Sequence, residues 1–223
     1  MKVAVPFSGG KDSTYAVYIA QQRGWEVTSL VTIMPLDIDA MLFHTPNIRL
    51  ASLLSDCLGI PLVSREAEHG ESQELDALKS VLKGLEVDAL VLGTIASDYQ
   101  KSRVDGICHD LGLRLFAPFW RRDQATLLDE YITSDFRILI TGVAAEGLDE
   151  SWLGRELDER ARKKLLELYK KHGLSPCGEG GEFETLVVDG PNFKKRLRII
   201  EAEREFKGLS GVYKVVKAEV ESK

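Results

Sequence analysis

The residue pattern best suited to chemistry lies near the start of the chain, in the loop Ser8-Gly9-Gly10-Lys11-Asp12-Ser13. This loop follows a short apolar run and precedes a helical pattern, the junction where an open α/β sheet binds ligands. Paired glycines allow successive backbone N–H groups to turn toward one anion, and the helix start adds more N–H groups and a positive dipole end. Lys11 adds a cation, and Ser8 and Ser13 add hydroxyl donors. We therefore expect this loop to hold the phosphates of a nucleotide.

The loop differs from two common phosphate-binding motifs. Val5 stands where the motif G-x-x-x-x-G-K-[ST] requires its first glycine, and Asp12 stands where it requires Ser or Thr. The motif G-x-G-x-x-G does not fit either. An aspartate beside the lysine would repel phosphate unless it helps to hold Mg²⁺, so we expect Asp12 to be a metal ligand. The alternative is an ordinary glycine turn with a serine at the helix N-cap.

A second polar segment, residues 93–103 (GTIASDYQKSR), follows an apolar run and should lie at the same sheet edge. Gly93 would allow a nucleotide or a backbone segment to approach closely. The substrate-binding candidates in this segment are Asp98, Tyr99, Gln100 and Arg103. In the alternative interpretation, Ser97 or Asp98 only caps a helix and Arg103 pairs with a neighbour.

A third segment, residues 177–185 (CGEGGEFET), places three carboxylates within six residues. Such a cluster repels itself in a purely structural loop, whereas it suits a cation or a positively charged substrate. The substrate-binding candidates here are Glu179, Gly181, Glu182, Glu184 and Thr185. The alternative is a solvated turn before a strand. Cys177 is not expected to be a nucleophile, because the only nearby histidine is His172 and small buried cysteines are more common.

Together, these three segments resemble the diphthine–ammonia ligase group within the PP-loop (N-type) ATP pyrophosphatase family. The hexapeptide resembles the signature of the family, and the sequence GEGGEFET at residues 178–185 is the most specific part of the resemblance. Residues 43–47 (FHTPN) also resemble that group, so the resemblance covers nearly the whole chain. Longer eukaryotic members of the group carry additional C-terminal domains.

The resemblance implies an ATP-dependent ligase that releases AMP and pyrophosphate, with ATP and Mg²⁺ as cofactors. The implied acceptor is diphthine, a modified histidine on translation elongation factor 2, and ammonium supplies the nitrogen of the amide in diphthamide. Lys11, Asp12 and Ser13 are then the expected catalytic residues, while the whole loop from Ser8 to Ser13 and Gly93 bind the nucleotide. The trimethylammonium group of diphthine would suit the carboxylate-rich third segment.

The elements that position these segments are predicted by apolar runs and helical spacing. Runs typical of strands buried on both faces of a parallel sheet cover residues 3–7, 27–33, 60–63, 89–92, 113–116 and 138–141. Helical patterns between them cover residues 13–23, 46–59, 72–83, 98–111 and 123–132. This alternation predicts a doubly wound, mostly parallel α/β sheet with right-handed crossovers. The resemblance implies the same fold, of the PP-loop/HUP-like, adenine nucleotide alpha hydrolase-like type.

The last third of the chain has a different pattern. A charged amphipathic helix is predicted over residues 157–172, followed by β-prone stretches at 183–188, 197–203 and 211–220 without obvious helices. We expect a small α+β appendage packed on the sheet domain. The predicted division is a PP-loop ATP-binding domain at residues 1–147 and a smaller substrate-binding α+β region at residues 148–223.

Charge and cysteine content restrict the partners and the compartment. The chain has 29 Lys and Arg against 35 Asp and Glu, a net charge of -6, which argues against broad nucleic-acid binding. No stretch approaches the length of a membrane span, and three cysteines without a C-x-x-C pair fit a reducing compartment. We therefore expect a cytoplasmic protein with no membrane contact and no direct nucleic-acid contact. The sequence allows a homo-oligomer without predicting one.

Two other functions are compatible with such a fold. One is a PP-loop enzyme that modifies tRNA, which normally needs a catalytic cysteine pair or a basic extension, and neither is found. The other is a nucleotide-binding sensor without catalysis. Lys11 and the acidic segment argue against the sensor, because neither is needed only to hold adenosine.

Overall fold

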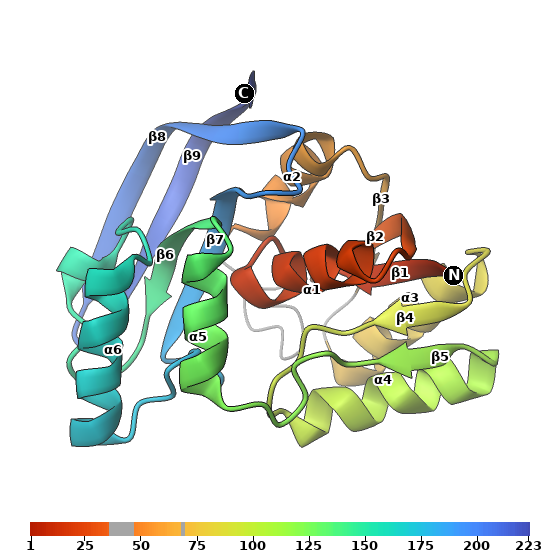
Figure 1. The fold of residues 1–223 in the computed structure, drawn as a ribbon, viewed down its shortest axis with the longest axis horizontal. Coiled ribbons are helices and arrows are strands. Elements are labelled where there is room, and N and C mark those ends of the chain that lie inside the picture. The colour runs from red at the N-terminus through yellow and green to blue at the C-terminus, as the bar shows by residue number, and fades with distance from the viewer. Residues whose placement is uncertain (36–46, 68–69) are drawn as a thin grey trace.

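The computed structural model describes residues 1–35, 47–67 and 70–223, and it contains two sheets (Figure 1). The first sheet has five strands in the order β3-β2-β1-β4-β5, all parallel. Their bounds are β1 Lys2–Pro6, β2 Glu26–Pro35, β3 Leu62–Ala67, β4 Ala89–Val91 and β5 Arg114–Phe116. The order reverses at β1, so the carboxyl ends of β1 and β4 flank the topological switch point where such sheets bind ligands.

Helices cover both faces of this sheet. Val3 and Val5 of β1 pack with α1 and α2 in one core, whereas Ala4 packs with α3 and α4 in another. Figure 1 shows α1 and α4 on opposite sides of the strands. The bounds are α1 Lys11–Gln22, α2 Ala51–Leu58 after the 3-10 helix η1 Ile48–Leu50, α3 Glu71–Lys83 and α4 Asp98–Leu111. The predicted doubly wound α/β fold is therefore confirmed.

The second sheet is antiparallel and has the order β7-β6-β9-β8. Its strands are β6 Arg137–Val143, β7 Phe183–Asp189, β8 Lys195–Lys207 and β9 Ser210–Ser222. The strand predicted at residues 138–141 exists, but its expected place in the parallel sheet is wrong. An apolar run reports burial on both faces and not strand direction, and β6 lies between β7 and β9 with Ile138 and Ile140 buried. The domain division after residue 147 stays a prediction. Strand β6 lies before this boundary, although it belongs to the second sheet.

One core joins the two sheets. Helices α5 Gln124–Thr133 and α6 Glu159–His172, with the short η2 Glu150–Trp152, lie beside the second sheet. Buried residues of β1, α1, α5, β6 and β7 belong to a single hydrophobic cluster. Strand β7 is also tied to the loop before α1, because the Val187 N–H donates to the Gly9 carbonyl at 2.9 Å. The second sheet is therefore fixed directly against the predicted phosphate loop.

Candidate active site

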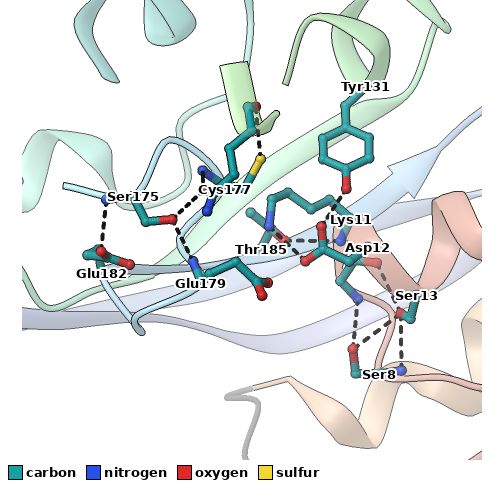
Figure 2. Close-up of polar contacts among 12 residues, drawn as sticks. Ser8, Lys11, Asp12, Ser13, Tyr131, Ser175, Cys177, Glu179, Glu182 and Thr185 are labelled. Carbon is teal, nitrogen blue, oxygen red and sulfur yellow. Dashed lines mark hydrogen bonds and ion pairs between the residues drawn. The ribbon is translucent and has the colours of Figure 1, made fainter. Parts of the chain in front are cut away.

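The loop between β1 and α1 presents free backbone donors at a helix start. Gly9 has φ +79°, a conformation that favours glycine, and a Cβ there would lie 2.5 Å from the Leu54 side chain. Helix α1 has no side-chain cap, and among the described residues nothing accepts a hydrogen bond from the N–H groups of Asp12 and Ser13. The hydroxyls of Ser8 and Ser13 lie 3.3 Å apart (Figure 2). This geometry suits an anion.

The buried Lys11 and the partly exposed Asp12 form an ion pair in the loop (Figure 2). The Lys11 side chain is 4% exposed, and its Nζ donates to Asp12 Oδ2 at 2.8 Å and lies 5.5 Å from the centre of the Phe183 ring. Burial is the largest single influence and disfavours the charged amine, but the charge and hydrogen bond of Asp12, together with the nearby Cys177 and Glu179, outweigh it and raise the pKa of Lys11 above 10.5. Lys11 is therefore a permanent cation at neutral pH.

Tyr131 of α5 completes this arrangement and was not predicted from the sequence. Its hydroxyl donates to Asp12 Oδ1 at 2.6 Å, so each carboxylate oxygen of Asp12 has one protein donor. The Tyr131 ring is fully buried, and burial followed by the charge of Asp12 raises its pKa well above 10. The phenol is therefore a fixed neutral donor. No local motif marks it, because 119 residues separate it from Asp12.

The three glutamates of the third segment occupy different environments. Glu179 is half-buried, and its Oε2 accepts from the Ala96 N–H at 2.8 Å, which ties the segment to the loop after β4. Glu182 accepts from two N–H groups of its own loop, those of Ser175 and Gly180, both at 2.8 Å. Burial and then the charge of Asp12 raise the pKa of Glu179. Glu182 thus braces the loop on which Glu179 is presented.

Glu184 differs from both because its carboxylate has no hydrogen-bond partner among the described residues. It lies partly buried on β7, close enough to Lys11, Asp12 and Glu179 to interact with their charges. Burial raises the pKa of Glu184 to about 7, opposed by Lys11 and reinforced by the negative charges of Asp12 and Glu179. This carboxyl group therefore changes its charge near neutral pH.

A cavity of about 270 Å³ connects the three segments. The predicted site residues that line it are Ser8, Gly10, Lys11, Asp12, Ser13, Gly93, Gln100, Glu179, Glu184 and Thr185. Thr185 also accepts from the Lys11 N–H at 3.1 Å. Gly93 permits a close backbone approach, because a Cβ there would lie 2.7 Å from the Asp12 carbonyl oxygen. The carboxyl ends of β1 and β4 and the start of β7 therefore form one site.

Other predicted residues, among them Asp98, Tyr99 and Arg103, do not line this cavity. Ser97 does line it, and its hydroxyl caps α4 by accepting from the Gln100 N–H at 3.2 Å, as the alternative interpretation held. Asp98 is exposed and pairs with Arg121 at 3.4 Å, and the Arg103 guanidinium stacks 4.6 Å from the centre of the Tyr99 ring. Gly181 and Glu182 are not among the lining residues either. A substrate role for these residues stays a prediction.

The cavity includes one polar group that sequence analysis missed. Thr94 is 6% exposed, lines the cavity, and its hydroxyl has no hydrogen-bond partner among the described residues. A buried hydroxyl without a partner is unfavourable unless a ligand satisfies it. The position of Thr94 directly after Gly93 was the available signal. The sequence FHTPN falls mainly on residues outside the described part of the chain.

Cys177 is buried, and its thiol donates to the Gln124 carbonyl at 3.2 Å. Burial raises its pKa to about 12, so the reactive thiolate is not formed near neutral pH. The expectation that Cys177 is not a nucleophile agrees with this environment.

The donor set suits a metal that arrives with the nucleotide. Within the described ranges, no three His, Cys, Asp or Glu side chains converge into a ready-made metal site. Mg²⁺ commonly takes one or two carboxylates and completes its shell with phosphate oxygens and waters. The Asp12 carboxylate is 27% exposed at the loop, and Glu179 lines the same cavity. These residues fit Mg²⁺ bound through phosphates.

No helix in the part of the chain that the structure describes is both long and apolar enough to cross a membrane.

Family models match both parts of the chain. Residues 1–115 match the model described as diphthamide synthase N-terminal domain, and residues 123–220 match the model described as diphthamide synthase C-terminal domain. All three segments of the site lie within these matched ranges.

Several curated proteins are similar to this chain along most of its length. A diphthine–ammonia ligase from Bos taurus is 35% identical, covering 91% of this chain and 84% of that protein. One from Danio rerio is 36% identical, with coverages of 89% and 86%. One from Schizosaccharomyces pombe is 37% identical over 91% of this chain, but the match spans only 37% of that longer protein. A solved structure described as a predicted subunit of a tRNA methyltransferase from Methanocaldococcus jannaschii matches with a TM-score of 0.47 and 19% identity, covering 86% of this chain and 98% of that chain.

Proposed function

The chain belongs to the diphthamide synthase family, and from this premise we propose that it is an ATP-dependent diphthine–ammonia ligase. The observation that carries the proposal is a single cavity that combines an anion-binding helix start with a carboxylate-rich wall. The first feature suits the phosphates of ATP, and the second suits the trimethylammonium group of diphthine. A site for ATP alone would not need the second feature.

A carboxylate resists attack by ammonia, because it is already anionic and has no good leaving group. In the proposed reaction, a carboxylate oxygen of diphthine attacks the α-phosphorus of ATP and pyrophosphate departs. Ammonia then attacks the carbonyl carbon of the acyl-adenylate, AMP leaves with the bonding electron pair, and the nitrogen loses a proton. The products are diphthamide, AMP and pyrophosphate.

The residues of the chain contribute position and charge. The β- and γ-phosphates are assigned to the loop from Ser8 to Ser13, whose free N–H groups and hydroxyls face the cavity. Lys11, held by Asp12, offsets the charge of the departing pyrophosphate. Thr94, beside Gly93, is assigned to the nucleoside because its buried hydroxyl lacks a protein partner. Mg²⁺, held by Asp12 and the phosphates, would neutralise further negative charge.

The proposed acceptor is translation elongation factor 2 carrying diphthine, and ammonium is the proposed nitrogen source. Two candidates, Glu179 and Glu184, line the cavity and lie near the loop that holds the phosphates. The carboxylates of Glu179 and Glu184 would attract the cationic group of the acceptor. The carboxylate of the acceptor would then face the α-phosphate of ATP.

The test is product analysis of labelled ATP incubated with the protein, Mg²⁺, ammonium and diphthine-bearing elongation factor 2, with each component omitted in turn. We expect AMP and pyrophosphate only in the complete mixture, together with the mass change from acid to amide. AMP without that mass change would reassign the acceptor. Release of ADP would overturn the proposed cleavage between the α- and β-phosphates.

A further inference from the structure

A second hollow adjoins the nucleotide cavity on the antiparallel sheet. It has a volume of about 660 Å³ and is lined by the end of β6, the tip of the β8–β9 hairpin and the start of β7. We call it the hairpin groove. Glu184 lines both the hairpin groove and the nucleotide cavity. The groove therefore begins where the nucleotide cavity ends.

Strand register places four residues of this groove in one row. Glu184 of β7 lies opposite Gly142 of β6, Gly142 lies opposite Val212 of β9, and Val212 lies opposite Glu205 of β8. Residues directly opposite each other share one face of a sheet. At a strand spacing of about 4.8 Å, the two glutamates stand roughly 14 Å apart along the row. Figure 1 shows the same order, with β6 between β7 and the β8–β9 hairpin.

The middle of the row is low because Gly142 has no side chain. A Cβ at Gly142 would lie 3.0 Å from the Cβ of Glu184, which is tighter than most real contacts. Glycine at this position therefore keeps the floor of the groove free of side-chain atoms. It also leaves room for the Glu184 side chain. A carboxylate stands at each end of this floor, with the apolar Val212 between them.

The charges of the groove favour a cationic ligand. Its lining contains Glu184 and Glu205 against Lys207 alone, and among the described residues no donor pairs with the Glu184 carboxylate. Glu182, two residues before Glu184, is by contrast satisfied by two backbone N–H groups. A quaternary ammonium group attracts carboxylates by charge alone and tolerates apolar neighbours such as Val212.

We propose that the hairpin groove is the acceptor site, in which the quaternary-ammonium side chain of the protein substrate lies across Gly142 between Glu184 and Glu205. This inference rests on the proposed ligase function and deepens it. Glu184, at the junction of the two cavities, holds the cation so that the carboxylate of the same side chain enters the nucleotide cavity. The rest of the acceptor protein leaves over the hairpin tip, where Leu209 is 69% exposed.

The test compares Glu205→Gln with Glu203→Gln. Both glutamates are exposed on β8, and only Glu205 lines the groove. With diphthine-bearing elongation factor 2, we expect Glu205→Gln to raise the KM for this acceptor about fivefold, an effect typical of one partly solvated charge contact. The KM for ATP should stay unchanged, because Glu205 lies outside the nucleotide cavity. Glu203→Gln should behave like the native protein.

A competition experiment gives an independent readout. Tetramethylammonium chloride should inhibit amide formation competitively with the acceptor, whereas sodium chloride at equal ionic strength should not. A native protein that forms no amide at all would overturn the proposed function. Normal amide formation, with Glu205→Gln equal to Glu203→Gln and no competition by tetramethylammonium, would overturn the groove assignment alone.

Discussion

Two loops border the nucleotide cavity, and they recognise charge in opposite ways. The loop from Ser8 to Ser13 offers backbone N–H groups, hydroxyls and one cation fixed by Asp12. The segment 177–185 offers carboxylates, and these lie in different environments. Glu182 is satisfied inside its own loop, whereas the Glu184 carboxylate has no protein donor in the described part of the chain. Two identical residues, two positions apart, therefore have different tasks that only their surroundings reveal.

The largest expected effect concerns the loop that binds anions. Lys11→Ala removes the buried cation and leaves Asp12 without its ion-pair partner. We expect turnover to fall by roughly two orders of magnitude or more, about 3 kcal/mol of lost transition-state stabilisation. Steady-state amide formation measures this fall. The control is Lys163→Ala on the exposed side of α6, which should change nothing. Near-normal turnover of Lys11→Ala would refute the role of the loop.

The second prediction separates the two glutamates. Glu184→Gln should lower kcat/KM for the acceptor about tenfold, because a carboxylate facing the substrate is lost. Glu182→Gln keeps one acceptor oxygen but loses a charge-assisted bond, so it should mainly destabilise the fold by about 1–2 kcal/mol. Acceptor kinetics and thermal unfolding, measured on both variants, test this division. Equal effects of the two variants in both measurements would remove the distinction.

The pH dependence sharpens the same comparison. The carboxyl group of Glu184 has a pKa of about 7 in the folded protein against an ordinary value of 4.5. Because this pKa is raised, the folded state binds the proton more tightly, and the stability of the native protein falls as pH rises from 4.5 to 7. Glu184→Gln should therefore be more stable than the native protein above pH 7, by up to about 3 kcal/mol.

Most of that gain in stability should disappear near pH 4.5, where the carboxyl group is protonated in the folded state and half protonated in the unfolded state. Unfolding curves at pH 4.5 and pH 8 measure the difference. Activity should change in the opposite direction, because binding of a cation requires the ionised carboxylate, so kcat/KM for the acceptor should rise through pH 7. A gain in stability that is independent of pH would show that Glu184 is not the titrating group.

An effect of similar size, on nucleotide affinity, is expected where the first loop meets β4. Gly93→Ala would place a Cβ 2.7 Å from the Asp12 carbonyl oxygen and push the first turn of α1 away. We expect nucleotide affinity to fall about tenfold, since a loop misplaced by a few tenths of an ångström loses aligned donors. Nucleotide titration measures this. The control is Gly106→Ala, which meets nothing within 4 Å on α4 and should stabilise the helix by up to about 1 kcal/mol. Unchanged affinity in Gly93→Ala would show that the loop tolerates displacement.

The strand-to-helix pattern predicts the fold and the first loop well, because local periodicity determines both. Strand direction was not predictable in the same way, since the apolar run of β6 is compatible with either sheet. In the second loop, the sequence showed where the carboxylates lie, but it did not show which of them is hydrogen-bonded within the loop and which faces the cavity. The pairing of Glu182 depends on the N–H groups of Ser175 and Gly180, and the surroundings of Glu184 depend on α1. Tyr131 could not be found from local spacing at all.

Tyr131 provides the most delicate test, because it acts on the first loop only through Asp12. Tyr131→Phe removes the hydroxyl that donates to Asp12 Oδ1 at 2.6 Å and leaves the buried ring in place. We expect a five- to tenfold loss of activity, as for one charge-assisted hydrogen bond. If Asp12 also holds Mg²⁺, the metal concentration for half-maximal activity should change as well.

Tyr15→Phe is the matched control for Tyr131→Phe. Its ring packs edge-on against Tyr131 at 4.9 Å between ring centres, but its hydroxyl contacts Glu130 and Ser134 at 3.4 and 3.5 Å, away from the loop. Both variants remove one hydroxyl from the same aromatic cluster, so a general loosening of the core would affect them equally. A change in Mg²⁺ dependence confined to Tyr131→Phe would place the effect on Asp12. The same change in both variants would mean that the cluster, and not the Tyr131 hydrogen bond, positions the loop.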